Sequence, residues 1–313
     1  MNDPVTRRTF LGAALAAAAV SSRMEARAMD MLDCHTHFYD PGRPQGVPWP
    51  DKSDRQLYRP VYPRDYQVLA LPLGITGTVV VEASEWVADN DWILDLATSE
   101  PLIKGFVGRL EPGAAEFGSG VERLAKNPTF RGIRVSGREV ASLTEPRRLN
   151  DLAVLADRGL ALDVNGDISS LPTVAAVARA VPRLRIVIDH VANVRIDGGP
   201  PPSDWQDGMG AAATRSNVFC KVSGLVEGTG RRGGQAPADP AFYRPVLDAV
   251  WRMFGDERVI FGSNWPVSEV FAPLATVVGI VRQYVATRGA EAERRYFAGN
   301  ARTAYFAHGD THL

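Results

Sequence analysis

The sequence predicts an α/β protein in which eight parallel strands and their helices close into a single (β/α)₈ barrel. Short β-branched runs alternate with amphipathic or Ala-rich stretches from residue 31 almost to the end of the 313-residue chain. The runs cover residues 31–37, 77–83, 103–110, 132–136, 160–166, 184–191, 218–223 and 258–264. This alternation is typical of parallel strands joined by helical crossovers, and eight units permit closure. An open doubly wound sheet is the alternative, which the count of eight disfavours.

Helices are expected where apolar residues recur at helical spacing between these runs. The sequence predicts them over residues 86–99, 146–158, 171–180, 241–254 and 273–287. Three of the connections that follow strands are long, at residues 38–62, 193–203 and 228–239. Barrel enzymes place their chemistry on the loops at the carboxyl ends of the strands. The three loops therefore predict a substrate pocket, with tolerated surface insertions as the alternative.

The first 28 residues have the features of an export signal and not of a folded element. Arg7 and Arg8 precede an Ala-rich run, and residues 26–28 offer an A-x-A cleavage site. The run is shorter than the roughly 20 apolar residues that span a bilayer. We therefore expect a twin-arginine signal peptide at residues 1–28 and a barrel domain at residues 29–313, periplasmic or secreted, with no membrane anchor after processing. If translation starts at Met29 or Met31, the protein is instead cytoplasmic.

The charge balance fits an enzyme of small molecules, and it would also fit a plain structural domain. The formal net charge is −1 at pH 7, and no basic stripe offers a surface for phosphates. Nucleic acid is therefore a poor candidate partner, and a small-molecule substrate is expected.

The two cysteines, Cys34 and Cys220, are too few for a disulfide framework. We expect both to be buried thiols facing the helical layer; no residue pattern indicates an oligomeric state.

Three of the five histidines fall at the ends of predicted strands. His35 and His37 are two residues apart on the first strand, so both side chains should face the barrel interior. His190 ends the sixth predicted strand. Two neutral imidazoles met by a third across the barrel mouth can hold one divalent metal ion, with zinc as the first candidate. The alternative is that the histidines only form structural hydrogen bonds.

Five motifs resemble the amidohydrolase superfamily and, more narrowly, its amidohydrolase-2 branch. They are Asp33-Cys34-His35-Thr36-His37-Phe38, Gly132-Ile133-Arg134, Ile188-Asp189-His190, Lys221-Val222-Ser223-Gly224 and Phe261-Gly262-Ser263-Asn264-Trp265-Pro266. The likeness runs from about residue 31 to residue 305 and implies a TIM-like barrel. The branch contains sugar-acid lactonases and the pyrone-dicarboxylate and sulfomuconolactone hydrolases, which implies hydrolysis of a small lactone by activated water. A metal-dependent decarboxylase of the same family and a non-catalytic periplasmic binder are the alternatives.

Two departures from the family pattern bear on the metal and on the base. The superfamily usually places an aspartate at the end of strand eight, where this chain has Asn264, whose amide cannot accept a proton at neutral pH. Asn264 could still orient a water or ligate weakly through its carbonyl oxygen. The fifth predicted strand also lacks the histidine that helps to bind a second metal in dinuclear relatives. The resemblance therefore implies one metal ion or none.

Another group must then act as the general base. Glu227 is the favoured candidate because it follows strand seven by four residues and adjoins a Gly-rich loop. Glu82, Asp163 and His190 are the alternatives. Each carboxylate could instead be a partner in a salt bridge or a helix cap.

Arg134 should point into the barrel from the fourth predicted strand. It could bind a substrate carboxylate or a developing oxyanion, or it could form an internal ion pair with Asp163 or Glu82. Lys221 on the seventh strand allows the same two interpretations. Further substrate-binding candidates are Glu82 and three aromatic residues that could stack on a sugar-like ring or belong to the core: Trp49, Tyr58 and Trp265.

Overall fold

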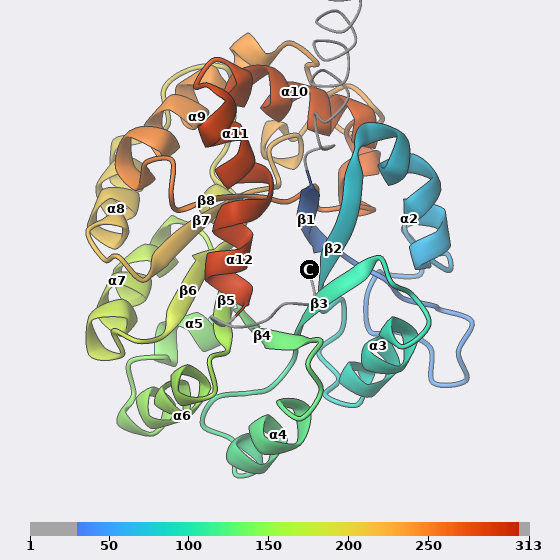
Figure 1. The fold of residues 1–313 in the computed structure, drawn as a ribbon, viewed down its shortest axis with the longest axis vertical. Helices are drawn as coiled ribbons and strands as arrows, with labels where there is room; N and C mark the ends of the chain where they lie inside the picture. The colour runs from blue at the N-terminus through green and yellow to red at the C-terminus, as the bar shows by residue number, and fades with distance from the viewer. Residues whose placement is uncertain (1–29, 307–313) are drawn as a thin grey trace, which may run out of the picture.

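The computed structural model describes residues 30–306, which form a barrel of parallel strands surrounded by helices (Figure 1). The strands are β1 (Met31–Thr36), β2 (Ile75–Val81), β3 (Ile103–Gly108), β4 (Phe130–Ser136), β5 (Ala161–Asn165), β6 (Arg185–Ile188), β7 (Val218–Val222) and β8 (Val259–Phe261). Each strand pairs in parallel with the next in chain order. The predicted eight-stranded parallel architecture is confirmed, whereas the predicted signal peptide at residues 1–28 lies outside the described residues.

Backbone hydrogen bonds join the first strand to the segment that follows the last. The His37 N–H donates to the Trp265 carbonyl at 2.9 Å, and the Asn264 N–H donates to the His35 carbonyl at 2.8 Å. These bonds bring the sheet to a nearly closed barrel. They also place Asn264 beside His35 and His37, although 227 positions separate Asn264 from His37 in the sequence.

Helices cover the outside of the barrel. They are α2 (Pro63–Ala70), α3 (Asp89–Ala97), α4 (Phe117–Leu124), α5 (Arg138–Ser142), α6 (Pro146–Asp157), α7 (Leu171–Ala180), α8 (Ser203–Ala213), α9 (Pro240–Phe254), α10 (Leu274–Ala286), α11 (Ala290–Arg294) and α12 (Asn300–Tyr305). Short 3₁₀ or π segments lie between them: η1 (Leu71–Leu73), η2 (Ile168–Ser170), η3 (Asp189–Asn193), η4 (Glu227–Thr229), η5 (Val267–Val270) and η6 (Arg295–Gly299). The five predicted helices correspond to α3, α6, α7, α9 and α10. Within residues 30–306, no helix has the length and apolar character needed to cross a membrane.

Helix α9 shows how local sequence sets these boundaries. The Asp239 side chain accepts a hydrogen bond from the Ala241 N–H at the N-terminus, and Pro240 occupies the first turn, where its missing N–H costs nothing. The helix ends before Gly255, whose φ of +67° suits glycine. The buried face, which includes Tyr243 and Leu247, packs toward the strands.

The barrel interior is apolar at one end and polar at the other. An inner apolar cluster joins strand residues to α12, and it contains Leu32, Cys34, Val79, Val81, Val107, Ala161, Val187, Phe219, Ile260, Ala301, Ala304, Tyr305 and Phe306. Helix α12 lies across this end of the barrel (Figure 1). The polar side chains therefore collect at the opposite end, where the strands finish.

The two cysteines are buried thiols, but they lie on different faces. Cys220 belongs to the cluster beneath the helices, as expected. Cys34 instead lies in the inner cluster, so the prediction that it faces the helical layer was wrong. The pairing of β1 with β2 shifts register between Asp33 and Thr36, and such a bulge breaks strict alternation. Cys34 and His35 can therefore both face inward.

Candidate active site

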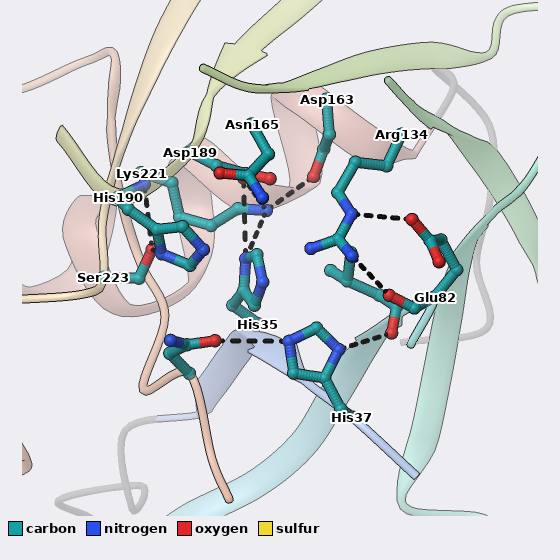
Figure 2. A network of polar contacts seen from close by, with 12 residues as sticks. His35, His37, Glu82, Arg134, Asp163, Asn165, Asp189, His190, Lys221 and Ser223 are labelled. Atoms are coloured by element: carbon teal, nitrogen blue, oxygen red, sulfur yellow. Dashed lines mark hydrogen bonds and ion pairs between the residues drawn. The ribbon is translucent and has the colours of Figure 1, made fainter. Parts of the chain in front are cut away.

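His35 on β1 and His37, which directly follows this strand, reach the polar end of the barrel interior (Figure 2). His35 has no exposed surface, and its ring centroid lies 4.9 Å from that of His37 and 4.4 Å from that of His190. Gly262 makes this packing possible, because a Cβ at that position would lie 2.8 Å from the Cβ of His35. The three histidines predicted to converge do so.

His190 comes from a left-handed turn and not from the end of a strand. Strand β6 stops at Ile188, and segment η3 follows with His190 at φ 52° and ψ 37°. The His190 Nδ1 lies 2.9 Å from the Ser223 hydroxyl. Burial, with help from the charge of Arg134, lowers the pKa of His190 to about 4, so the imidazole is neutral at pH 7.

Asp189 turns into the barrel beside His190. The ligand atoms of His35, Asp189 and His190 all lie within 4.8 Å of one another. Asp189 is fully buried, but the charge of Lys221, with a smaller contribution from the contact with His35, outweighs that burial and holds the pKa of Asp189 well below the ordinary value. Asp189 is therefore a carboxylate at neutral pH. The sequence predicts that His190 faces inward from a regular strand, and strand alternation would then turn Asp189 outward. For this reason the sequence did not identify Asp189 as a site residue.

Lys221 is a fully buried cation at the base of this cluster. Its Nζ lies 2.6 Å from Asp163 Oδ2, 2.8 Å from Asp189 Oδ1 and 3.3 Å from His35 Nδ1. Burial alone would lower the pKa of Lys221, but the two carboxylates outweigh it and raise the pKa. Of the two interpretations of Lys221, the structure shows the internal ion pair.

A second chain of polar contacts runs from β2 through His37 to Glu227. His37 Nδ1 lies 2.9 Å from the Val81 carbonyl, which can only accept, so Nδ1 carries the proton. Burial, with the charge of Arg134, lowers the pKa of His37 to about 3, so Nε2 keeps its lone pair. Asn264 Nδ2 donates to Glu227 Oε1 at 2.9 Å, which turns the amide oxygen toward His37 Nε2 at 3.2 Å. The two hydrogen-bond acceptors, His37 Nε2 and Asn264 Oδ1, thus face each other, and a cation between or beside them would stabilise this arrangement.

Glu227 has an unusual setting for a carboxylate. Its Oε2 is buried without a hydrogen-bond partner among the described residues. Burial raises the pKa of Glu227 to about 7, because only Asn264 and the backbone donate to it. A carboxylate with that pKa can both accept and return a proton at neutral pH.

Arg134 is anchored to Glu82 by two contacts. Its Nε donates to Glu82 Oε1 at 2.9 Å, and its Nη2 donates to the Glu82 carbonyl at 2.8 Å. The predicted pair with Glu82 is therefore present, and the alternative with Asp163 is wrong because Asp163 pairs with Lys221. The guanidinium lies beside the histidines, whose pKa values its charge lowers (Figure 2).

The aromatic candidates separate into one residue at the site and two away from it. The half-buried Trp49 ring lies 5.9 Å from the His37 ring and lines a cleft with Glu82. Trp265 is buried in the core against Tyr66, with ring centroids 5.1 Å apart, so its prediction as a stacking platform was wrong. Within residues 30–306, no hydrogen bond or ring contact joins Tyr58 to the other candidates, and its N–H donates to the Asp54 carbonyl.

Sequence comparison adds the family. A family model described as amidohydrolase matches residues 32–307. The chain belongs to this family. An L-fucono-1,5-lactonase of Burkholderia ambifaria is 32% identical over 280 residues, which cover 86% of this chain and 93% of the relative. An L-fucono-1,5-lactonase of Burkholderia multivorans is 27% identical over 290 residues, 88% of this chain and 95% of its own.

A solved amidohydrolase structure agrees with the fold. The structure, from Burkholderia multivorans with bound Zn, has a TM-score of 0.77 and 25% identity, and the match covers 88% of this chain and 99% of that one. The resemblance to the amidohydrolase-2 branch is thereby confirmed. The chain is a hydrolase of that type.

The side chains of this amidohydrolase fit a divalent metal ion. His35 Nε2 is buried without a hydrogen-bond partner in the described part of the chain, and it belongs to the cluster with Asp189 and His190. Imidazole nitrogens and a carboxylate oxygen suit borderline divalent ions. The hydrogen bond between His190 Nδ1 and Ser223 fixes the ring orientation, as partners of metal-binding histidines do. Ser223 lies two residues after Lys221, so both side chains should point to the same face, and this spacing could have identified Ser223 from the sequence.

Proposed function

We propose that this amidohydrolase opens a small lactone of the sugar-acid class by attack of water on the lactone carbonyl. The 32% identity with an L-fucono-1,5-lactonase over 86% of the chain carries the proposal. The site supports it, because a carboxylate with a pKa of about 7, a fixed guanidinium and a metal-ligand cluster lie together at the polar end of the barrel. The sequence predicted the same reaction.

The proposed cofactor is one divalent ion, with zinc as the first candidate. His35, His190 and Asp189 would hold it. His37, the third histidine predicted as a ligand, lies outside this group of three, with its ring centroid 4.9 Å from that of His35. Such an ion, when bound, polarises a carbonyl and lowers the pKa of water. Lys221 would keep Asp189 in place, because it already neutralises part of the carboxylate charge.

Glu227 is proposed as the general base. Its free Oε2 would take a proton from the attacking water as the new C–O bond forms at the carbonyl carbon. The ring C–O bond then breaks, and Glu227 returns the proton to the departing hydroxyl oxygen. Asn264 would orient Glu227 through its 2.9 Å hydrogen bond without exchanging a proton itself.

Arg134 is proposed to stabilise the oxyanion that forms on the carbonyl oxygen. Its planar guanidinium suits a negatively charged oxygen, and the two contacts to Glu82 hold it in a fixed position before substrate binds. Glu82 would then act through Arg134. Trp49 would offer an aromatic face to the sugar-like ring from the neighbouring cleft.

Turnover of a small panel of esters tests this function. We expect L-fucono-1,5-lactone to be opened with kcat/KM of at least about 10⁴ M⁻¹ s⁻¹, after spontaneous hydrolysis is subtracted in a pH-stat. An acyclic ester such as p-nitrophenyl acetate should be roughly 100-fold poorer, because the cyclic substrate is held in register with the base. If the folded, zinc-supplemented protein binds lactones in a calorimeter but turns none over, it is a binder and the proposal fails.

Residues 1–28 are proposed to direct export by the twin-arginine route, with residues 29–313 as the exported barrel domain. The arginine pair stands before a weakly hydrophobic Ala-rich run, which is the required order. Replacing Arg7 and Arg8 by Lys should leave the precursor in the cytoplasm. Normal accumulation of the Lys variant in the periplasm, measured by cell fractionation, would contradict the assignment.

A further inference from the structure

Four consecutive residues after β6 adopt the left-handed conformation. His190, Val191 and Ala192 have φ of 52°, 47° and 56°, and Asn193 has φ of 47°. None of them is glycine, and residues with a Cβ disfavour this region. Val191 is β-branched, which makes the conformation still less favourable. The turn must therefore be held by its surroundings.

Three elements hold the turn at successive residues. At its start, the His190 N–H and ring both contact the Ser223 hydroxyl that follows β7. In its middle, the Trp205 indole N–H donates to the Val191 carbonyl at 2.8 Å, and both residues are fully buried. At its end, the Asn193 side chain donates to Asn165 and to the Gly166 carbonyl, both at 3.0 Å.

The turn explains how neighbouring residues can serve one site. In an extended strand, successive side chains point to opposite faces, so Asp189 and His190 would be separated by the sheet. Asp189 has the inward parity of Val187, and the left-handed turn that begins at His190 brings His190 to the same side. The ligand atoms of His35, Asp189 and His190 therefore lie within 4.8 Å of one another. If the turn relaxed toward extended backbone, His190 would move away from Asp189 and His35.

We propose that Trp205 is a positioning residue, because its indole N–H holds the left-handed turn that keeps Asp189 and His190 on the same side as His35. Trp205 lies on α8, outside the barrel, and reaches the turn from the helical layer. Its kinetic consequence rests on the proposed lactone hydrolysis, whereas its consequence for metal binding does not. The bond to Val191 acts on a backbone atom, so the effect should not depend on the substrate.

Trp205→Phe tests the proposal, since it removes the N–H donor and keeps an aromatic ring in the core. We expect kcat on the lactone to fall about 10-fold with little change in KM, and the dissociation constant for Zn²⁺, measured by chelator competition, to rise about 10-fold. Trp251→Phe is the matched control, because Trp251 is a buried tryptophan on α9 that packs against Tyr284 and Tyr296. In the control both quantities should stay within about twofold of wild type.

Ala192→Gly tests whether the loss in Trp205→Phe comes from the turn and not from altered core packing. Glycine adopts the left-handed region freely, so the turn would need less support from Trp205. Added to Trp205→Phe, it should recover at least about threefold in both kcat and Zn²⁺ affinity. Unchanged kcat and Zn²⁺ affinity in Trp205→Phe, or losses that Ala192→Gly does not reduce, would overturn the proposal.

Asn193→Asp keeps the test decisive if Trp205→Phe does not fold. Asn193 is exposed, and Asp also tolerates the left-handed region but has no N–H to donate. The turn loosened at its end should weaken Zn²⁺ binding about threefold, and wild-type Zn²⁺ affinity in this variant would overturn the role assigned to the turn. Wild-type protein without lactone turnover would instead count against the proposed function, because the Zn²⁺ comparison does not depend on it.

Discussion

Replacing Glu227 by Gln is expected to lower kcat for lactone opening by at least about 100-fold, the scale of a lost general base. Gln keeps the size of the side chain and can accept the hydrogen bond from Asn264 through its amide oxygen, but it cannot take a proton from water. The measurement is steady-state turnover of L-fucono-1,5-lactone at pH 8, where wild-type Glu227 is ionised. Wild-type turnover in this variant would exclude Glu227 as the base.

Two controls separate this loss from a folding defect. Burial raises the pKa of Glu227 to about 7, above its value in the unfolded chain, so the stability of the wild type falls as pH rises through 7. The Gln variant has no such group and should melt at a higher temperature than wild type at pH 8, with a smaller difference at pH 5. Glu269→Gln, which removes a partly exposed carboxylate paired with Arg59, should leave kcat within about twofold of wild type.

Changing His35 and His37 together to Ala is expected to reduce turnover by at least about 1,000-fold and to bring the Zn²⁺ content of purified protein close to zero. The cluster would keep only His190 and Asp189, too few ligands for a divalent ion in a site of this kind. The measurements are lactone turnover and elemental analysis of the same sample. Both imidazoles are neutral when buried, so no unpaired charge is left behind.

The matched control is the double change of His308 and His312 to Ala, which alters the two histidines of the chain that are not among the site candidates. Turnover and Zn²⁺ content should remain those of the wild type, within about twofold. Thermal unfolding must show a cooperative transition for both variants. Full turnover in a folded His35, His37 double variant would place the active site elsewhere.

The barrel was predictable because its signal is repeated along the whole chain. Each βα unit carries a β-branched run and an apolar-periodic stretch, so the eight strands could be located independently. Helices such as α4 and α8 were missed because both contain glycine, which weakens the helical pattern. His35 and His37 were found because two side chains two residues apart on a predicted strand share a face.

Departures from regular geometry account for what the sequence did not reveal. The bulge in β1 lets His35 face inward together with Cys34, and the left-handed turn brings His190 to the side of Asp189, against strand alternation in both cases. Trp265 follows Asn264, whose φ of 59° redirects the chain, and its ring enters the core. The register between β4 and β5 could not show which acid pairs with Arg134. Arg134 lies opposite Asp163 in that register, but Asp163 instead pairs with Lys221, which reaches it from β7.

The pH dependence of kcat/KM for lactone opening tests the role of Glu227 most directly. If Glu227 is the base, the wild-type rate should fall on the acidic side with a midpoint near the pKa of about 7 of that carboxyl, about tenfold per pH unit below it. In Glu227→Gln this limb should be absent from the residual rate. If the acidic fall in rate has the same midpoint in both proteins, Glu227 is not the base. If that midpoint lies near pH 4, it points to His190, whose pKa is about 4.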